Sequence, residues 1–253
     1  APQAYNEDLH IEAVGGALAL IRLAKGLKPE YSHSVSASAD LYHSFGRLQA
    51  NLLVEGFYTM LNNVFTLVRI GENEDGSIVY WERRNGSGAT VAGVNFEGKI
   101  GIPHRFELQL GYTLQSSRYD TPERWSDQLA PQRKMFRAPD HYGYLTSLFD
   151  ITPRFKASLF GTYTGSMLVK HILSDGTNET DLEQNTPSFW DMGIKLAYTF
   201  RIGKAVNLEV NTGVKNIFDA YQKDLDYGAF KDADYVYGPS LPRMYFVGIK
   251  FSI

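Results

Sequence analysis

The chain has 253 residues, a net charge of −3 and no cysteine. The charge argues against a nucleic-acid partner, which normally demands a basic face, and the lack of cysteine excludes disulfides and thiolate metal sites. No run approaches 18 apolar residues, so a membrane helix is excluded, whereas a membrane β-barrel needs only every second residue apolar.

The N-terminal stretch gives the weakest structural signals. Ala1-Pro2-Gln3 does not resemble a signal peptide, and we expect a processed or nicked start. Residues 17–25 are the nearest candidate for a helix. Elsewhere the pattern is that of strands.

Nine later segments alternate between apolar and polar residues, and each is close to the 9–11 residues that a tilted membrane strand needs. The cleanest is 105–115, where Phe106 and Leu108 face one way while Glu107 and Gln109 face the other. The nine expected strands are 34–43, 47–60, 89–100, 105–115, 140–151, 155–165, 194–201, 206–215 and 243–253.

Short and long connections alternate strictly between these strands. Short turns lie near Phe45-Gly46, Pro103-His104, Thr152-Pro153-Arg154 and Gly203-Lys204, and the long polar loops are 62–88, 116–138, 168–187 and 217–242. This is typical of a transmembrane barrel with short periplasmic turns and long extracellular loops. The pairs Asp75-Gly76 and Asn85-Gly86 are typical of hairpin turns, so loop 62–88 is expected to carry its own strand extension.

Eight charged side chains on the expected strands lie opposite the apolar face. They are Asp40, Glu55, Glu97, Glu107, Lys156, Lys195, Glu209 and Lys250. A soluble barrel or sandwich would expose the same charges to water, so they do not decide the solvent. The loops sorted by length, and an apolar face that mixes Leu, Val and Ile with Tyr and Phe, favour the membrane barrel.

The last strand alternates to the end of the chain, with Tyr245, Val247 and Ile249 on one face. The spacing of Gly248, Phe251 and Ile253 resembles the C-terminal signal by which outer-membrane barrels are recognised for insertion. If Ile253 lies at the periplasmic rim, all long loops and the stretch 1–32 lie outside. The chain is therefore expected in the bacterial outer membrane, in contact with lipid and lipopolysaccharide.

Three motifs give a resemblance to TonB-dependent outer-membrane receptors. They are Gly213-Val-Lys-Asn-Ile-Phe-Asp-Ala-Tyr221, then Tyr235-Val-Tyr-Gly-Pro-Ser-Leu-Pro-Arg243 before the last strand, and Leu27-Lys-Pro-Glu30. Ala1-Pro2-Gln3 is similar to the remainder of that family's Arg-Ala-Pro stretch. The style of the sequence resembles receptors from the Bacteroidetes.

The resemblance implies an all-β fold, a transmembrane antiparallel barrel of 22 strands with a plugged lumen. This chain has about nine or ten of those strands, so residues 1–253 are expected to form the C-terminal portion of the barrel, without the plug and N-terminal strands. Open edges in lipid cost several kcal/mol per unpaired amide. The expected partners are therefore the N-terminal remainder of the receptor and, through its plug, TonB.

The function that the resemblance implies is active import rather than catalysis. The leading hypothesis is uptake of a metal chelate: cobalamin, a siderophore or haem. The first alternative is import of an oligosaccharide or peptide together with a surface-exposed lipoprotein, and the second is a passive porin or structural barrel. No nucleophile lies beside Asp140-His141 in the sequence, and we expect no enzyme activity.

Candidate ligand-binding residues lie in two outer loops, because aromatic side chains offer rigid contact area at low entropy cost. They are Arg118, Tyr119, Arg124 and Trp125 in one loop and Tyr221, Tyr227, Phe230, Tyr235 and Tyr237 in the other. The same rings could instead form an interfacial girdle or pack against neighbouring loops.

Acidic residues and histidines complete the candidate sites. Asp224, Asp226, Asp232 and Asp234 offer the hard oxygen ligands that calcium prefers, although their spacing matches no EF-type loop. Solvated acidic loops are common and explain them without calcium, and no intrinsic cofactor is expected. His10 and His171 would lie outside, where they could contact haem or simply occupy the surface.

Overall fold

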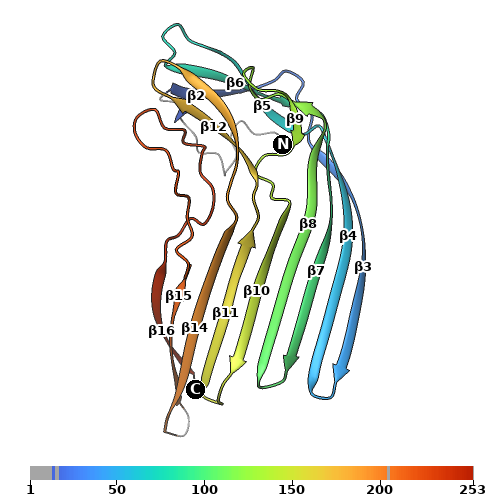
Figure 1. The fold of residues 1–253 in the computed structure, drawn as a ribbon, viewed down its shortest axis with the longest axis vertical. Helices are drawn as coiled ribbons and strands as arrows, with labels where there is room; N and C mark the ends of the chain where they lie inside the picture. The colour runs from blue at the N-terminus through green and yellow to red at the C-terminus, as the bar shows by residue number, and fades with distance from the viewer. Residues whose placement is uncertain (1–12, 15–16, 204–205, 253) are drawn as a thin grey trace.

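The computed structural model describes residues 13–14, 17–203 and 206–252, and the described part contains strands and no helix. Nine long strands form one curved wall (Figure 1). They are β3 (Tyr31–Phe45), β4 (Leu48–Asn62), β7 (Ala89–Ile102), β8 (Phe106–Glu123), β10 (His141–Asp150), β11 (Phe155–Thr164), β14 (Phe189–Ile202), β15 (Val206–Lys215) and β16 (Met244–Ser252). Each pairs antiparallel with the next one along the chain, in the order 3-4-7-8-10-11-14-15-16. All nine expected strands are therefore confirmed.

The connections sort to the two ends of the wall as the sequence predicts. At the short-turn end lie tight links such as Gly46, which has φ +63°, and His104, which has φ +60°. The long connections gather at the opposite end of the wall, which we call the outer end (Figure 1). No helix in the described residues is long and apolar enough to cross a membrane.

Two outer loops contain hairpins of their own. Loop 62–88 carries β5 (Phe65–Glu72) and β6 (Ile78–Asn85), which confirms the expected extension and its turn at Asp75-Gly76. Asn85-Gly86 instead closes β6, because the Asn85 side chain donates to the carbonyls of Lys28 and Asn63. Loop 168–187 carries β12 (Leu168–Ser174) and β13 (Glu179–Asn185), which the sequence pattern did not predict.

Two other expectations are corrected at the outer end. Residues 17–25, the nearest candidate for a helix in a sequence with no convincing one, are not helical: β2 (Ala17–Leu23) is a strand that pairs in parallel with β6 and antiparallel with β1 (Ala13–Val14). The loop expected to begin at 116 is also wrong there, since β8 runs on to Glu123 and pairs with β9 (Gln132–Lys134). In both cases pairing with a distant segment supplies the hydrogen bonds that the local pattern does not indicate.

The register divides the wall into two chemically different faces. Residues that are directly opposite share a face, so Phe106, Leu110 and Tyr112 of β8 continue into Phe149, Leu145 and Gly143 of β10. We call this the exterior face. The other, or interior, face carries the charges, including all eight charged residues that the alternation assigned to the polar side.

Interior polar groups are paired across neighbouring strands. Asn95 donates to Glu55 over 3.0 Å and accepts from the Thr113 hydroxyl over 2.8 Å. Lys99 lies 2.9 Å from Glu107, and Lys156 lies 3.0 Å from Asp150. These ladders suit a wet interior, since the charged side chains remain partly exposed.

The motif Asn216-Ile217-Phe218-Asp219 after β15, which is part of the resemblance given above, has a structural explanation. Asn216 has φ +49° and is buried, and its amide donates to the carbonyls of Ala220 and Leu241, each over 2.9 Å. Asp219 accepts the backbone N–H of Arg243 over 2.9 Å. The block thus ties the end of β15 to the entry of β16, across a loop of more than twenty residues.

The exterior face gives a prediction about its solvent. Leu145 lies in the middle of β10 on the exterior, and Thr146 beside it lies on the interior. In the full receptor Leu145→Arg should lower the free energy of unfolding by about 2–4 kcal/mol, as for charges near the bilayer midplane, and Thr146→Arg should change it little. Denaturant titration of receptor folded into lipid vesicles measures both. Equal effects would contradict a lipid-facing exterior.

Candidate functional site: the outer loops and the interior wall

The β12–β13 hairpin is the centre of the outer loops. Its turn is built by Asp175, whose carboxylate accepts the backbone N–H groups of Thr177 and Asn178 over 2.8 and 2.7 Å. These bonds hold the pKa of Asp175 below its ordinary value. Three further segments pack against this hairpin: loop 216–243, loop 124–140 and the β5–β6 hairpin.

Loop 216–243 shares a small apolar core with the hairpin. Val169 of β12 packs with Phe189, Tyr235 and Tyr237, and Met167 and Ala220 cover the cluster. Tyr235 and Val169 are each 1% exposed. The two tyrosines predicted to bind ligand are therefore buried packing residues, as the alternative of packing against neighbouring loops allowed.

A polar network surrounds that core. The hydroxyl of Tyr235 lies 2.6 Å from Oδ2 of Asp224 and 2.6 Å from Oε1 of Gln184, and the hydroxyl of Tyr237 donates to the other Asp224 oxygen. Burial raises the pKa of Asp224, but the two tyrosine hydrogen bonds outweigh it and leave that pKa lowered. Burial and the neighbouring carboxylate together raise the pKa of Tyr237 to about 12, and they raise that of Tyr235 as well.

His171 lies inside this unit rather than on the surface. Its ring stacks on Tyr235 with centroids 3.6 Å apart and planes 6° from parallel, and its Nε2 lies 2.9 Å from Oδ2 of Asp226. Asp232 is also buried and accepts the backbone N–H of Ile172 over 2.8 Å. Burial raises the pKa of Asp232, although that hydrogen bond opposes the shift. The predicted surface role of His171 is wrong, since the residue is 5% exposed.

Loop 124–140 docks on the other side of the hairpin. The indole Nε1 of Trp125 donates to Glu183 over 2.8 Å, and the ammonium of Lys170 lies 5.2 Å from the Trp125 ring and 4.9 Å from the Phe136 ring. Burial lowers the pKa of Lys170, while nearby carboxylates oppose that shift. Arg137 donates to the carbonyl of Val236 over 2.8 Å, which joins this loop to loop 216–243.

The β5–β6 hairpin completes the unit through one arginine. Arg69 donates to Glu179 of β13 over 2.7 Å and to Glu72 over 2.6 Å. Burial lowers the pKa of Arg69, but the bonds to the two carboxylates raise it overall. The outer loops are thus one packed body, which we call the outer-loop unit.

An open hollow of about 450 Å³ lies between the hairpin turn and the tip of loop 216–243. Tyr227, which is 84% exposed, and Phe230 border it, together with Leu173, Asp226 and Lys231. It combines rings with charges of both signs, which is a suitable surface for a ligand of mixed polarity. Of the nine predicted ligand residues, Tyr227 and Phe230 are the two that this hollow brings together.

The other predicted ligand residues are dispersed. Arg118 and Tyr119 are consecutive on β8 and so face opposite sides of the wall, Arg118 to the exterior. Arg124 and Tyr221 are exposed, and Trp125 is held by its contacts to Glu183 and Lys170.

The four aspartates of the calcium hypothesis are used separately. Asp224 binds the tyrosines, Asp226 faces His171, Asp232 accepts a backbone N–H, and Asp234 pairs with Arg137 at 3.2 Å. Within the described ranges no three acidic, histidine or cysteine side chains gather in a way that could hold a metal ion. A calcium site stays a prediction. Of the insertion signal, Gly248 and Phe251 lie on β16, and Ile253 lies outside the described residues.

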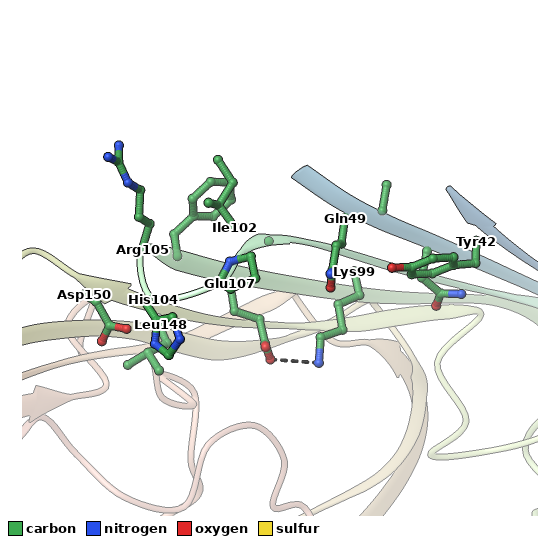
Figure 2. A pocket seen from close by; sticks show the side chains of 14 residues that line it. Tyr42, Gln49, Lys99, Ile102, His104, Arg105, Glu107, Leu148 and Asp150 are labelled. Carbon is green, nitrogen blue, oxygen red and sulfur yellow. Dashed lines mark ion pairs between the residues drawn. The ribbon is translucent and has the colours of Figure 1, made fainter. Parts of the chain in front are cut away.

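The interior wall has a second hollow, of about 370 Å³, at the short-turn end. Figure 2 shows Lys99 and Glu107 paired at its centre, with Tyr42, Gln49 and Asp150 around them. Its lining comes from β3, β4, β7, β8 and β10. No sequence signal singled it out, because its members are distant in the chain and only the register assembles them.

At several points of the wall an aromatic ring covers a glycine of the neighbouring strand. In five cross-strand pairs a ring of one strand covers a glycine of the next, where a Cβ would collide with it; one is Tyr112–Gly143 on the exterior face, and the other four are Phe57–Gly93, Tyr144–Gly111, Phe160–Gly193 and Phe246–Gly213. The last four lie on the interior face. Rings that cover glycines in this way pin the register and fill the space above the bare backbone.

Comparison with known proteins identifies the class. The family model "TonB dependent receptor-like, beta-barrel" matches residues 4–217, so the chain belongs to the TonB-dependent receptor β-barrel family. This is a family of bacterial outer-membrane transporters and receptors rather than enzymes. A search of curated proteins finds no match.

Solved structures share the fold. Fiu, the ferric-catecholate import receptor of Escherichia coli K12, is 22% identical with a TM-score of 0.58, over 90% of this chain and 28% of that one. FpvA of Pseudomonas aeruginosa with a heterologous ferric pyoverdine is 15% identical with a TM-score of 0.61, over 89% and 27%. The FrpB iron transporter of Neisseria meningitidis is 13% identical with a TM-score of 0.55, over 94% and 33%. The chain thus spans about a third of these receptors or less.

The tyrosine–aspartate network predicts a local stability effect. Tyr235→Phe removes the hydroxyl that contacts Asp224 and Gln184, and an unsatisfied buried partner costs about 1–3 kcal/mol. We expect faster proteolysis and faster amide exchange in β12 and loop 216–243, with the wall strands unchanged. Tyr227→Phe, at an exposed ring, is the matched control. Exchange rates equal to wild type in Tyr235→Phe would refute a stabilising network.

The raised tyrosine pKa predicts alkaline opening of the outer-loop unit. The pKa of Tyr237 rises from an ordinary 10 to about 12 on folding, so between these values the unfolded segment loses a proton that the folded one keeps. Stability is fully present below pH 10 and is lost as pH rises toward 12. Subtilisin cleavage of the loops, normalised to an unfolded substrate, should accelerate from pH 10 to 11. The Tyr237→Phe variant should be less stable at pH 10, but its cleavage rate should rise less steeply between pH 10 and 11. Equal slopes of cleavage rate against pH in the variant and in wild type would contradict the assignment of the alkaline effect to Tyr237.

Proposed function

We propose that this chain forms the C-terminal part of an outer-membrane receptor that imports a metal chelate, most simply a ferric siderophore, with TonB as its energy source. The observation that carries the proposal is the division of the wall. Its exterior is apolar, its interior is polar, and one end is covered by packed loops (Figure 1). This arrangement supports a pathway through a membrane that is closed to unselected solutes at its outer end.

The choice of cargo rests on two supports. The similar structures include one described as a ferric-catecholate import receptor and one described as a ferripyoverdine receptor bound to ferripyoverdine. The hollow beside Tyr227 and Phe230 offers aromatic faces next to Lys231 and Asp226. Aromatic rings with a cation nearby suit a rigid anionic chelate. Cobalamin and haem share this mixture of planar and charged groups and belong to the same proposal.

The remaining partners are inferred from the edges of the wall. Among the described residues, no strand pairs with the edge of β3 that faces away from β4 or with the edge of β16 that faces away from β15. We propose that further strands of the same receptor close the barrel at both edges, and that a plug inside it contacts TonB. The interior hollow at Lys99 and Glu107 lies on the wall that such a plug would face.

Uptake measurements test the cargo. Cells lacking the gene should lose growth on one ferric siderophore, on haem or on cobalamin as the limiting source, while growth on oligosaccharides and peptides is unchanged. Loss on an oligosaccharide or peptide instead would replace the chelate by the alternative cargo, and TonB-independent diffusion would indicate a porin.

Variants of the outer hollow locate the cargo. In the full receptor Tyr227→Ala/Phe230→Ala should raise the KM for uptake about tenfold, because two stacking surfaces are removed. Phe218→Ala, an exposed ring outside the hollow, is the control and should leave KM unchanged. A Tyr227→Ala/Phe230→Ala receptor with wild-type KM would place the cargo elsewhere.

A further inference from the structure

The tip of loop 216–243 is an arch, residues 227–231, whose two feet are Asp226 and Asp232. Oδ2 of Asp226 accepts the backbone N–H of Asp232 over 3.2 Å, so the feet are tied to each other. Each foot is also bonded to β12: Oδ2 of Asp226 lies 2.9 Å from Nε2 of His171, and Asp232 accepts the backbone N–H of Ile172 over 2.8 Å. Because a carboxylate only accepts, Nε2 of His171 is the donor.

The arch has little support of its own. Tyr227 is 84% exposed, and Gly228 has φ +96° with open space where a Cβ would lie. Among the residues that the structure describes, none makes a hydrogen bond or ion pair with a side chain of the arch. Phe230 covers Gly176 at the hairpin turn, where a Cβ would come within 2.6 Å of the ring. The place of the arch over the hollow therefore depends mainly on its feet.

His171 is built to hold one foot in a fixed direction. The residue is 5% exposed and its ring is stacked on Tyr235, with centroids 3.6 Å apart. Leu182 lies directly opposite on β13 and offers no competing polar group. Nδ1 of His171 is buried without a partner in the described part of the chain, which is unfavourable. Phenylalanine would fill the same place without that cost, so the bond to Asp226 is what the imidazole adds.

We propose that His171 is a positioning residue for cargo recognition: through Asp226 it fixes the arch so that Tyr227 and Phe230 border the hollow. The inference deepens the proposed function and rests on it, since the same hollow is taken there as the cargo site. An arch that is already in place loses less conformational freedom when cargo binds, whereas a loose arch presents its rings only part of the time.

Two substitutions separate the hydrogen bond of His171 from its stacking. His171→Phe keeps a ring on Tyr235 and removes the donor, whereas His171→Gln keeps a donor near the place of Nε2 and removes the ring. Amide hydrogen exchange of the full-length receptor in detergent, without cargo, compares them. Exchange at 226–232 should be faster in His171→Phe than in His171→Gln, and exchange along β12 should be faster in His171→Gln. The reverse order, or equal rates at 226–232, would overturn the proposal.

Uptake kinetics measure the consequence for cargo. The probe is radiolabelled ferric catecholate, ferripyoverdine, haem or cobalamin, whichever restores growth in the uptake experiment above. His171→Phe should raise KM about fivefold at an unchanged maximal rate, as when the binding arrangement falls to roughly a fifth of the population. His171→Gln should recover most of the wild-type KM. His33→Phe, the same substitution on the exterior of β3, is the control and should leave KM unchanged. A lower maximal rate at wild-type KM would indicate loss of folded receptor and contradict a positioning role.

The positioning role and the cargo site can fail separately. The exchange measurement contains no cargo, so it decides whether His171 fixes the arch wherever the cargo binds. If Tyr227→Ala/Phe230→Ala leaves KM at its wild-type value, the proposed cargo site is wrong. If that double variant raises KM while His171→Phe does not, the cargo site stands and the role of His171 is wrong.

Discussion

The rest of the structure depends on one constraint: the exterior face of the wall carries no charged side chain between the short-turn end and Arg118. Lipid offers no hydrogen bonds, so each backbone group of the wall must pair with a neighbouring strand, and each charge must lie on the other side. Lys99 with Glu107 and Lys156 with Asp150 show the result, since their ion pairs all lie on the interior. The same constraint keeps the polar connections at the ends of the wall.

The outer-loop unit is stabilised in a different way from the wall. Its strands are short, and a two-stranded hairpin is marginal alone, so β12 and β13 depend on side-chain contacts from segments about 40 to 110 residues away. Stacking of His171 on Tyr235, the bond from Trp125 to Glu183 and the bridge from Arg69 to Glu179 all end on this hairpin. Because they meet there, loosening one contact weakens the others. Motion at the outer end is therefore expected to be collective, which suits a cover over a pathway.

Alternation predicted the wall because the lipid–water division repeats at every second residue along a strand. It failed at β12, where LVKHILS places Lys170 on the same side as Leu168 and Ile172, and at β13, where ETDLEQN contains only one apolar residue, Leu182; distant loops decide burial in both. It also placed Tyr235 and Tyr237 among ligand residues, since composition cannot distinguish a ring that contacts cargo from one that forms a loop core. The exterior orientation of Arg118, in contrast, could have been predicted from the sequence, because the alternation from Phe106 to Leu114 extends to residue 118 without interruption.

Under the proposed import function, the interior wall bears on where selectivity would reside. Its rings cover glycines instead of projecting, and many of its charges are satisfied by residues on adjacent strands. A wall whose charges are largely paired would interact weakly with a passing solute, which would favour release over capture. In the proposed receptor, recognition would then fall to the outer end, where Tyr227 and Phe230 remain exposed on a unit whose buried aromatic residues are committed to packing.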